Sequence, residues 1–315
     1  MKSARRPIIV LANTTAEHLL PSVCRTLRAR RGKMQIERFS DGEICVRFFE
    51  TLRDTEVVIL GGTQPPAENF LELALLASAA HECGAREITM VVTYLGYNRQ
   101  DKSATGFPAA RLPIKLLAHS GAKRILVVDP HVLATLAHAT PLSARAIAGA
   151  PAGAAHLKRR KRQLVVVSPD AGGRERARKM ARLLGAPIPI VLHKQRNAQR
   201  RASIDASHAR SALAGHDVLL VDDVIDTGGT LAAAADAVRA VGARHIIAFA
   251  THGLFSGDAL KRLGRSSLDE ILVTDTLPPI TSRIKGSKAR LHIIPIAPLL
   301  ASALRGVITR PTKRE

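Results

Sequence analysis

The sequence is poor in aromatic residues, which make up 3% of its 315 residues, and tryptophan is absent. Proteins that bind single-stranded nucleic acids stack the bases on aromatic side chains, so a surface of that kind is not expected. No helix-turn-helix or zinc-finger pattern is present either. We therefore predict no nucleic-acid partner. The net charge of +21 is interpreted mainly as solvated helix ends and loops, with phosphorylated small substrates as a further source of basic residues.

Cysteine is also scarce, and long apolar runs are missing. The three cysteines, Cys24, Cys45 and Cys83, are odd in number, far apart and without metal-ligand spacing. We interpret them as buried free thiols. No apolar run is long enough to span a bilayer, and the first ten residues lack the apolar core of a secretory signal. These absences predict a cytoplasmic protein with no membrane partner.

Short β-branched segments alternate with helical segments along the chain. This rhythm is typical of an α/β fold with mostly parallel sheets flanked by helices. It restarts after the Ala/Gly/Pro-rich segment 144–155, which predicts two similar domains, residues 1–148 and 149–315. The predicted strands are 7–11, 57–61, 88–93, 125–128, 164–167, 188–193, 218–221, 245–250 and 271–274, and the clearest helices are 15–30 and 68–82.

Residues 217–240 combine a strand, two acids, a turn of small residues and a helix. The strand is predicted over 218–221 and the Ala-rich helix over 231–241. Between them, backbone N–H groups of Thr227, Gly228, Gly229 and Thr230 can converge on a phosphate at the positive end of the helix. The segment therefore predicts a phosphate site.

Asp222 and Asp223 stand just before this turn, where a carboxylate would repel a phosphate. They fit better if they face the hydroxyl groups of a sugar, directly or through a divalent cation. A ribose 5-phosphate would satisfy both parts. The alternative is an ordinary strand-to-helix connection with an Asp/Thr helix cap. The pattern resembles the loop that binds phosphoribosyl pyrophosphate (PRPP) in phosphoribosyltransferases and PRPP synthetases.

Two further polar residues follow predicted strands. Asp170 precedes a diglycine turn after 164–167, and an acid there can hold a metal or a sugar hydroxyl. His131 follows 125–128 and predicts a metal or phosphate contact, although a loop histidine can be incidental. We expect every such cluster to lie beyond the carboxyl end of a strand, where α/β folds bind their ligands.

Basic and amide side chains form two more clusters. Lys194 and Arg196 follow the predicted strand 188–193 and could stabilise charge during phosphoryl transfer, although in isolation a surface pair is the favoured interpretation. Arg99, Gln100 and Asp101 follow the strand 88–93 and could hold a triphosphate and an adenine edge.

Phe39, Asp41 and Glu43 surround a glycine turn within residues 38–47. From the residues alone, a plain hairpin turn is the favoured interpretation of this segment.

Taken together, these segments resemble the ribose-phosphate pyrophosphokinases, or PRPP synthetases, over nearly the whole chain, and they indicate a divergent member. The resemblance implies two domains of the phosphoribosyltransferase type. It also implies an enzyme, a ribose-phosphate diphosphokinase, which uses magnesium (Mg²⁺) to move the β,γ-diphosphoryl group of ATP to the 1-hydroxyl of ribose 5-phosphate. The matching segments are FSDGE at 39–43, LGYNRQD at 95–101, VVDPH at 127–131, VVVSPDAGGRERA at 165–177, HKQR at 193–196, VDDVIDTGGTL at 221–231, ATH at 250–252 and VTDTLP at 273–278.

The resemblance assigns a role to each candidate residue. It implies a C-terminal domain that binds ribose 5-phosphate and an N-terminal domain on the ATP side, in an oligomer of at least two copies. The implied sugar contacts are Asp222, Asp223, Asp226, Thr227, Gly228, Gly229 and Thr230; the ATP contacts are Phe39, Asp41, Glu43, Arg99, Gln100, Asp101 and His131; the metal contacts are His131 and Asp170; the catalytic cations are Lys194 and Arg196.

Two segments depart from the family's usual sequences, namely 102–113 and 129–139. In the family these regions help to build an allosteric ADP and phosphate site, and we expect that regulation to be absent. The alternatives to an active synthetase are a non-catalytic, synthetase-like regulatory subunit and a PRPP-binding phosphoribosyltransferase or regulator. A regulatory subunit would be expected to lose the catalytic cations, which this chain keeps.

Overall fold

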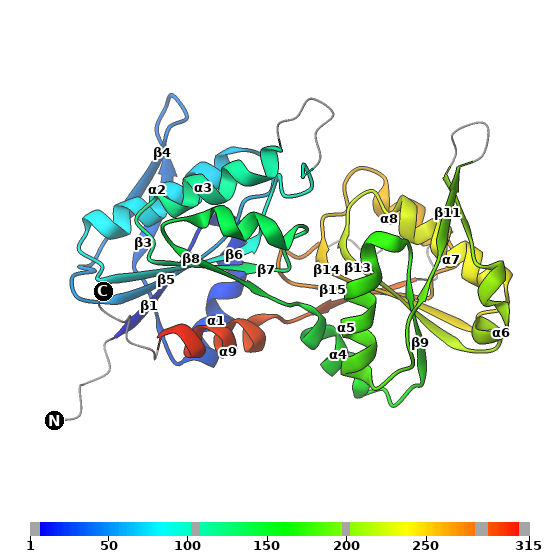
Figure 1. Ribbon diagram of the computed structural model, residues 1–315. Helices are drawn as coiled ribbons and strands as arrows, with labels where there is room; N and C mark the ends of the chain where they lie inside the picture. The colour runs from blue at the N-terminus through cyan, green and yellow to red at the C-terminus, as the bar shows by residue number, and fades with distance from the viewer. Residues whose placement is uncertain (1–6, 102–107, 197–201, 281–288, 309–315) are drawn as a thin grey trace. The chain divides into compact units, whose positions relative to one another are not determined.

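The computed structural model describes residues 7–101, 108–196, 202–280 and 289–308, without the side chains of 194–196, 202 and 203 (Figure 1). It divides into two compact units. The first comprises residues 1–148, 276–278 and 297–315, and the second comprises 149–275 and 279–296. The C-terminal helix therefore belongs to the first unit, although the sequence rhythm had grouped it with the second half of the chain.

The first unit contains a six-stranded parallel sheet in the order β2-β1-β5-β6-β7-β8. Helices α1 and α9 lie on one face of the sheet, and α2 and α3 lie on the other (Figure 1). The elements are β1 (Ile8–Ala12), η1 (Thr14–Leu19), α1 (Leu20–Leu27), β2 (Arg30–Arg31), β5 (Glu56–Gly62), α2 (Glu68–Glu82), β6 (Glu87–Tyr94), η2 (Ala109–Arg111), α3 (Leu112–Ala118), β7 (Arg124–Val128), η3 (Leu133–Ala139), β8 (Ser143–Ile147) and α9 (Ala297–Ile308).

Two strands of the first unit stand apart from this sheet. They are β3 (Met34–Arg38) and β4 (Ile44–Phe48), which pair antiparallel as a hairpin. Turn residues 39–43 separate two short alternating strands, so the local pattern favours a hairpin over a crossover. The plain hairpin expected from the sequence around residues 38–47 is what the structure contains.

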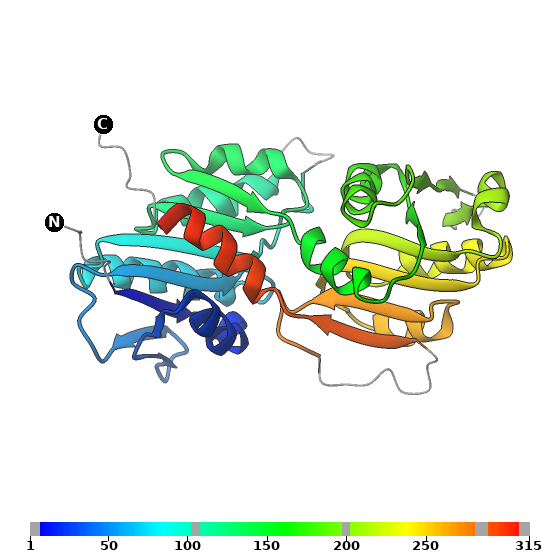
Figure 2. The same cartoon turned by 90° about the horizontal axis from the view of Figure 1, so that it is seen from below.

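The second unit contains a parallel sheet in the order β10-β9-β13-β14-β15-β16 and a separate antiparallel pair, β11 with β12. Figure 2 shows the strands of the larger sheet side by side. The elements are α4 (Ala150–Lys158), β9 (Leu164–Ser168), η4 (Ala171–Gly173), α5 (Arg174–Leu184), β10 (Ile190–Val191), β11 (His193–Arg196), β12 (Ala202–Asp205), η5 (Ser207–Ala209), α6 (Arg210–Leu213), β13 (Asp217–Ile225), α7 (Gly229–Ala240), β14 (His245–Gly253), α8 (Ala259–Arg265), β15 (Glu270–Thr274) and β16 (Arg290–Ile294).

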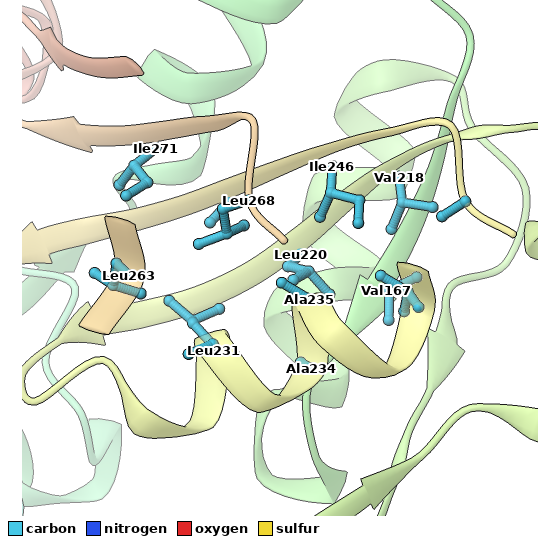
Figure 3. Close-up of a cluster of buried hydrophobic side chains, with 14 of the residues drawn as sticks. Val167, Val218, Leu220, Leu231, Ala234, Ala235, Ile246, Leu263, Leu268 and Ile271 are labelled. Atoms are coloured by element: carbon cyan, nitrogen blue, oxygen red, sulfur yellow. The ribbon is translucent and has the colours of Figure 1, made fainter. Parts of the chain in front are cut away.

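The core of the second unit lies on both faces of its sheet. Successive strand residues point to opposite faces, so Val218 and Leu220 pack toward α7, whereas Leu219 and Val221 pack toward α4 and α5. Figure 3 shows the α7 side of this core. A strand buried on both faces reads as a continuous apolar run, which is why this strand was visible in the sequence.

The predicted α/β class with mostly parallel sheets is confirmed. Several local predictions were wrong, however. The strand expected over 188–193 is reduced to β10, and Ile188 is 86% exposed because β10 pairs with β9 only through Ile190 and Val191. The Ala/Gly/Pro-rich segment 144–155, after which the rhythm restarts, contains most of β8 and the start of α4.

The thiols also differ from expectation. Cys83 is exposed, and Cys24 and Cys45 are half-buried, although all three are free as predicted. Cys83 caps the C-terminus of α2, where the chain turns at the protein surface. Within the described residues, no helix has the length and apolar character needed to cross a membrane.

Candidate functional site

The strand order of the second sheet reverses between β9 and β13, because β10 lies on one side of β9 and β13 on the other. In open α/β sheets, ligands bind beyond the carboxyl ends of the strands at such a switch point. Asp170 follows β9. The acid pair, Asp222 and Asp223, and the predicted phosphate loop, residues 226–230, lie at the end of β13. The topology therefore brings these two clusters, predicted from separate segments, to one sheet edge.

The phosphate loop, residues 226–230, connects β13 to α7. Gly228 has a φ of 72°, and a Cβ atom there would lie 2.8 Å from Cγ of Leu263, so glycine is required on both counts. Helix α7 begins at Gly229, and its N-cap residue, Gly228, has no side chain that could accept a hydrogen bond from the first turn. Its first N–H groups and the positive end of its dipole therefore suit an anion.

The acid pair lies on β13 itself, which continues to Ile225 instead of ending at Val221 as predicted. Asp223 is buried, and its Oδ2 is 2.9 Å from a guanidinium nitrogen of Arg176 on α5. Asp222 is half-buried, and its Oδ1 accepts a hydrogen bond of 2.9 Å from the Asp223 backbone N–H. Strand and helix together thus fix both carboxyl groups.

These two carboxyl groups have different electrostatic surroundings. Burial, together with the neighbouring charge of Asp223, raises the pKa of Asp222 to about 7. Arg176 opposes this effect but is bonded to Asp223. A bound cation, or hydroxyl groups donating to the carboxylate, would favour its charged form. The pair is therefore built to gain from such a ligand.

Asp170 is fixed by the turn that follows it. Its Oδ1 accepts hydrogen bonds from the backbone N–H groups of Gly172, at 3.0 Å, and Gly173, at 3.2 Å. The Ser168 hydroxyl donates to the Asp170 carbonyl at 2.7 Å. The diglycine turn expected from the sequence thus orients this carboxylate at the end of β9, and η4 contacts β13.

In the first unit, two other predicted clusters are joined by Asn98. Its Nδ2 donates to the Thr135 hydroxyl at 2.7 Å, and its Oδ1 accepts from the Val132 backbone N–H at 2.8 Å. Asn98 is 1% exposed, so it ties the segment after β6 to the segment after β7 in a buried place. These segments carry the exposed residues Arg99, Gln100 and His131 and the half-buried Asp101.

Phe39, Asp41 and Glu43 lie in the turn of the β3–β4 hairpin. The Phe39 N–H donates to the Glu43 carbonyl at 2.9 Å, and the Glu43 N–H donates to Oδ1 of Asp41 at 3.0 Å. The Phe39 residue is 51% exposed. These residues follow the carboxyl end of β3, a strand of the hairpin and not of the large parallel sheet.

Lys194 and Arg196 also lie off the large sheet, on β11. In the antiparallel pairing with β12, Lys194 is opposite Ile204 and Arg196 is opposite Ala202. Their side chains are outside the described part of the structure. Leu192, just before β11, donates its N–H to the Ser168 carbonyl at 3.0 Å, which keeps the start of this hairpin beside the end of β9.

His131 and Asp170, the two predicted metal contacts, belong to different units, so each is described only within its own unit. Among the described residues, no group of three or more His, Cys, Asp or Glu side chains is arranged to hold a metal. Sequence reasoning missed Arg176 and Asn98, the two residues that organise the predicted clusters. Arg176 lies on α5, and only the fold reveals that Asp223 is its partner.

Two family models match the chain. Residues 8–121 match the N-terminal domain of ribose phosphate pyrophosphokinase, and residues 138–271 match the phosphoribosyl transferase domain. Among curated proteins, the ribose-phosphate pyrophosphokinase of Mesorhizobium japonicum is 34% identical, over 95% of this chain and 96% of its own. That of Pasteurella multocida is 35% identical, over 94% of each chain. The crystal structure of phosphoribosylpyrophosphate synthetase from Mycobacterium smegmatis is similar with a TM-score of 0.84 at 31% identity, covering 96% of this chain and 99% of that one.

Proposed function

The chain belongs to the ribose-phosphate pyrophosphokinase family, and from this premise we propose that it makes PRPP from ATP and ribose 5-phosphate. The observation that carries the proposal is the phosphate loop with its acid pair at the switch point of the second sheet. The relatives that bear the enzyme's name match this chain over nearly its full length. We assign the sugar contacts to the second unit and the nucleotide contacts to the first.

On the sugar side, Asp222 and Asp223 accept hydrogen bonds from the 2- and 3-hydroxyl groups of ribose. The 5-phosphate binds to the N–H groups of residues 226–230, at the N-terminus of α7. The ion pair with Arg176 holds the buried Asp223 carboxylate in place, while hydroxyl donors stabilise the charged form of Asp222, whose pKa is raised in the free protein. The sugar is thereby oriented with its 1-hydroxyl presented for reaction.

On the nucleotide side, Arg99, Gln100 and His131 contact the phosphates and base of ATP, with Asp101 beside them. Their segments follow neighbouring strands and are joined through Asn98, which supports a shared role. In the exposed hairpin turn, Phe39 with Asp41 and Glu43 completes the adenine site of a second copy of the chain. At least a homodimer is therefore proposed.

In the second unit, the Asp170 carboxylate suits a divalent cation of the magnesium type. Carboxylate oxygens are its preferred ligands, and Mg²⁺ commonly uses one or two carboxylates, water and substrate phosphates rather than a full protein cage. Asp170, oriented by its turn, and His131 are the proposed protein contacts. When bound, the cation neutralises charge on the nucleotide phosphates.

In the proposed reaction, the 1-hydroxyl oxygen of ribose 5-phosphate forms a bond to the β-phosphorus of ATP and gives up its proton. The bond between that phosphorus and the oxygen bridging to the α-phosphate breaks, and AMP leaves with the bonding electrons. Lys194 and Arg196 stabilise the negative charge on the transferred group. Catalysis comes from positioning and charge neutralisation.

The test is AMP release from ATP in the presence of ribose 5-phosphate and Mg²⁺. We expect AMP and PRPP in equal amounts, and at least a tenfold lower kcat, about 1.4 kcal/mol of barrier, in Lys194→Ala. Lys261→Ala, a lysine on α8 away from the proposed contacts, serves as the matched control and should keep the wild-type rate. Folded wild-type protein that binds PRPP but forms no AMP would instead identify the non-catalytic alternative.

A further inference from the structure

The segment that follows β14 donates hydrogen bonds to backbone carbonyl groups just before and within the phosphate loop. The Ile225 carbonyl accepts hydrogen bonds from the backbone N–H groups of Leu254, at 2.9 Å, and Phe255, at 3.0 Å. The Asp226 carbonyl accepts one from the Ser256 backbone N–H at 3.1 Å. Two successive carbonyl groups thus point toward residues 254–256.

The next carbonyl, that of Thr227, is held by a side chain. A guanidinium nitrogen of Arg262, on α8, donates to it. Three successive carbonyl groups, 225 to 227, therefore point toward residues 254–262, which we call the support segment. Arg262 is the last residue of the support segment, and its side chain contacts the Thr227 carbonyl of the loop.

This arrangement fixes the direction of the N–H groups that are proposed to bind phosphate. In a planar trans peptide, the carbonyl and the following N–H point in opposite directions. With carbonyls 225 to 227 turned toward the support segment, the N–H groups of Asp226, Thr227 and Gly228 are turned away from it. Successive N–H groups that point to the same side form an anion-binding concavity.

The peptide between Thr227 and Gly228 depends most on such an external contact. Glycine has few steric barriers to rotation about φ, and Gly228 adopts a φ of 72°. The Leu263 side chain limits the space for a Cβ atom at Gly228. Because this side chain is apolar, it cannot orient the peptide between Thr227 and Gly228 through a hydrogen bond. Leu263 is buried in the same apolar cluster as Leu231 of α7 (Figure 3), so α8 is a fixed support for Arg262.

We propose that Arg262 is a positioning residue for ribose 5-phosphate. By holding the Thr227 carbonyl outward, it keeps the Gly228 N–H directed into the phosphate loop. It acts from behind the loop and is not itself a phosphate ligand. This inference rests on the proposed function of the loop.

The surroundings of Arg262 allow a substitution that should leave the fold intact. It is exposed and lines a cavity of about 360 Å³ together with Lys261 and Arg265 of the same helix. Replacing an exposed side chain should change the melting temperature by no more than about 3 °C. Lys261→Gln removes the same charge from the same helix and cavity, and so separates peptide orientation from general electrostatic attraction.

The experiment compares steady-state kinetics of the wild type, Arg262→Gln, Arg262→Lys and Lys261→Gln. For Arg262→Gln we expect the KM for ribose 5-phosphate to rise about five- to tenfold, with kcat and the KM for ATP within about twofold of wild type. Arg262→Lys keeps one donor and should recover most of this loss. Lys261→Gln should leave all three constants within about twofold.

The inference is overturned if Arg262→Gln changes the KM for ribose 5-phosphate by less than about twofold, or if Lys261→Gln raises it equally. Should Arg262→Gln not fold, the same comparison between Arg262→Lys and Lys261→Gln decides, with an expected rise of about two- to threefold in the former only. Calorimetric binding of ribose 5-phosphate without ATP gives an independent reading. Weaker binding of ribose 5-phosphate to Arg262→Gln than to the wild type supports the inference, whether or not the wild type forms AMP. A wild type that forms no AMP would refute only the proposed reaction.

Discussion

Where the strand order of the first sheet reverses, between β1 and β5, polar groups of Asn13, Thr15 and Gly62 bond to one another. Nδ2 of Asn13 donates to the Gly62 carbonyl at 3.2 Å, and the Thr15 hydroxyl donates to Oδ1 of Asn13 at 2.6 Å. The same hydroxyl accepts from the Gly62 N–H at 2.8 Å. At the equivalent place in the second sheet, the chain instead forms the acid pair and the phosphate loop.

The two units therefore have similar strand orders but different switch points. In the first unit, Asn13 and Thr15 form hydrogen bonds with Gly62 at this place, whereas Oε1 of the buried Gln64 has no hydrogen-bond partner among the described residues. The proposed nucleotide contacts follow β6 and β7 instead. In the second, the raised pKa of Asp222 and a helix N-terminus whose cap residue is glycine favour a ligand. The same strand order therefore gives a ligand-binding site only where the residues that connect the strands supply groups that bind a ligand.

The largest effect should come from the acid pair. Asp222→Asn removes a charged acceptor for the ribose hydroxyl groups and should lower kcat/KM for ribose 5-phosphate about 300-fold, roughly 3.4 kcal/mol. Steady-state AMP release measures this change, with Lys261→Gln as the folded control. A loss below about tenfold would mean that the carboxylate does not contact the sugar.

The corresponding change at the first switch point should affect stability without affecting sugar binding. Asn13 is fully buried and bonds to Gly62, Thr15 and the Asn69 carbonyl. Asn13→Ala should lower the free energy of unfolding by about 2–3 kcal/mol, measured with urea, because buried partners lose their hydrogen bonds. If this variant instead raised the KM for ribose 5-phosphate by more than about twofold, the contrast between the switch points would fail.

The sequence predicted the central strands and the phosphate loop because both depend on local information. The continuous apolar run at 218–221 and the small residues at 227–230 are visible without knowledge of the fold. The end of β13 could not be predicted from the sequence. Its extension to Ile225 is fixed by the pairing of Val224 with His252 and of Ile225 with Gly253 on β14. Partner strands of this kind leave no local signal.

The prediction of the site residues was limited in the same way. Asp222, Asp223 and Asp170 could be identified as candidates because each follows a predicted strand and precedes a turn of small residues. Their neighbour Arg176 is 47 residues from Asp223 in the chain, so only the packing of α5 beside β13 brings them together. Arg262 was missed for the same reason, since its partner is a backbone carbonyl.

A further comparison concerns the two ends of the second sheet, where buried acids have opposite pKa shifts. At the amino end, burial tends to raise the pKa of Glu270, but hydrogen bonds from Arg160 and His245 outweigh it and lower the pKa to about 2. Glu270→Gln should lower the free energy of unfolding by about 2 kcal/mol at pH 7.

The pH dependence of this effect follows from the lowered pKa. The stabilisation by Glu270 is complete above its ordinary pKa of 4.5 and is lost as the pH falls through about 2. Urea unfolding of Glu270→Gln and wild type should therefore converge between these values. A difference that stays constant down to pH 2 would show that the carboxylate charge is not what stabilises the sheet.

The smallest effect is expected from Asp222 in the absence of ligand, and its sign is opposite. A raised pKa gives stability that is complete below the ordinary value of 3.8 and is lost as the pH rises through about 7. Asp222→Asn should therefore raise the free energy of unfolding by about 1 kcal/mol at pH 8, and the gain should vanish near pH 4. A destabilised variant at pH 8 would show that the charged carboxylate is already well paired in the free protein.

We propose that ribose 5-phosphate binds at the second switch point and not at the first. Amide hydrogen exchange of the wild-type protein with and without ribose 5-phosphate tests it directly, because binding should slow exchange where N–H groups contact the phosphate. We predict slower exchange in peptides covering 222–232 and no change in those covering 12–16 and 60–64. Protection at the first switch point, or none at 226–230 when ribose 5-phosphate is bound, would contradict the claim.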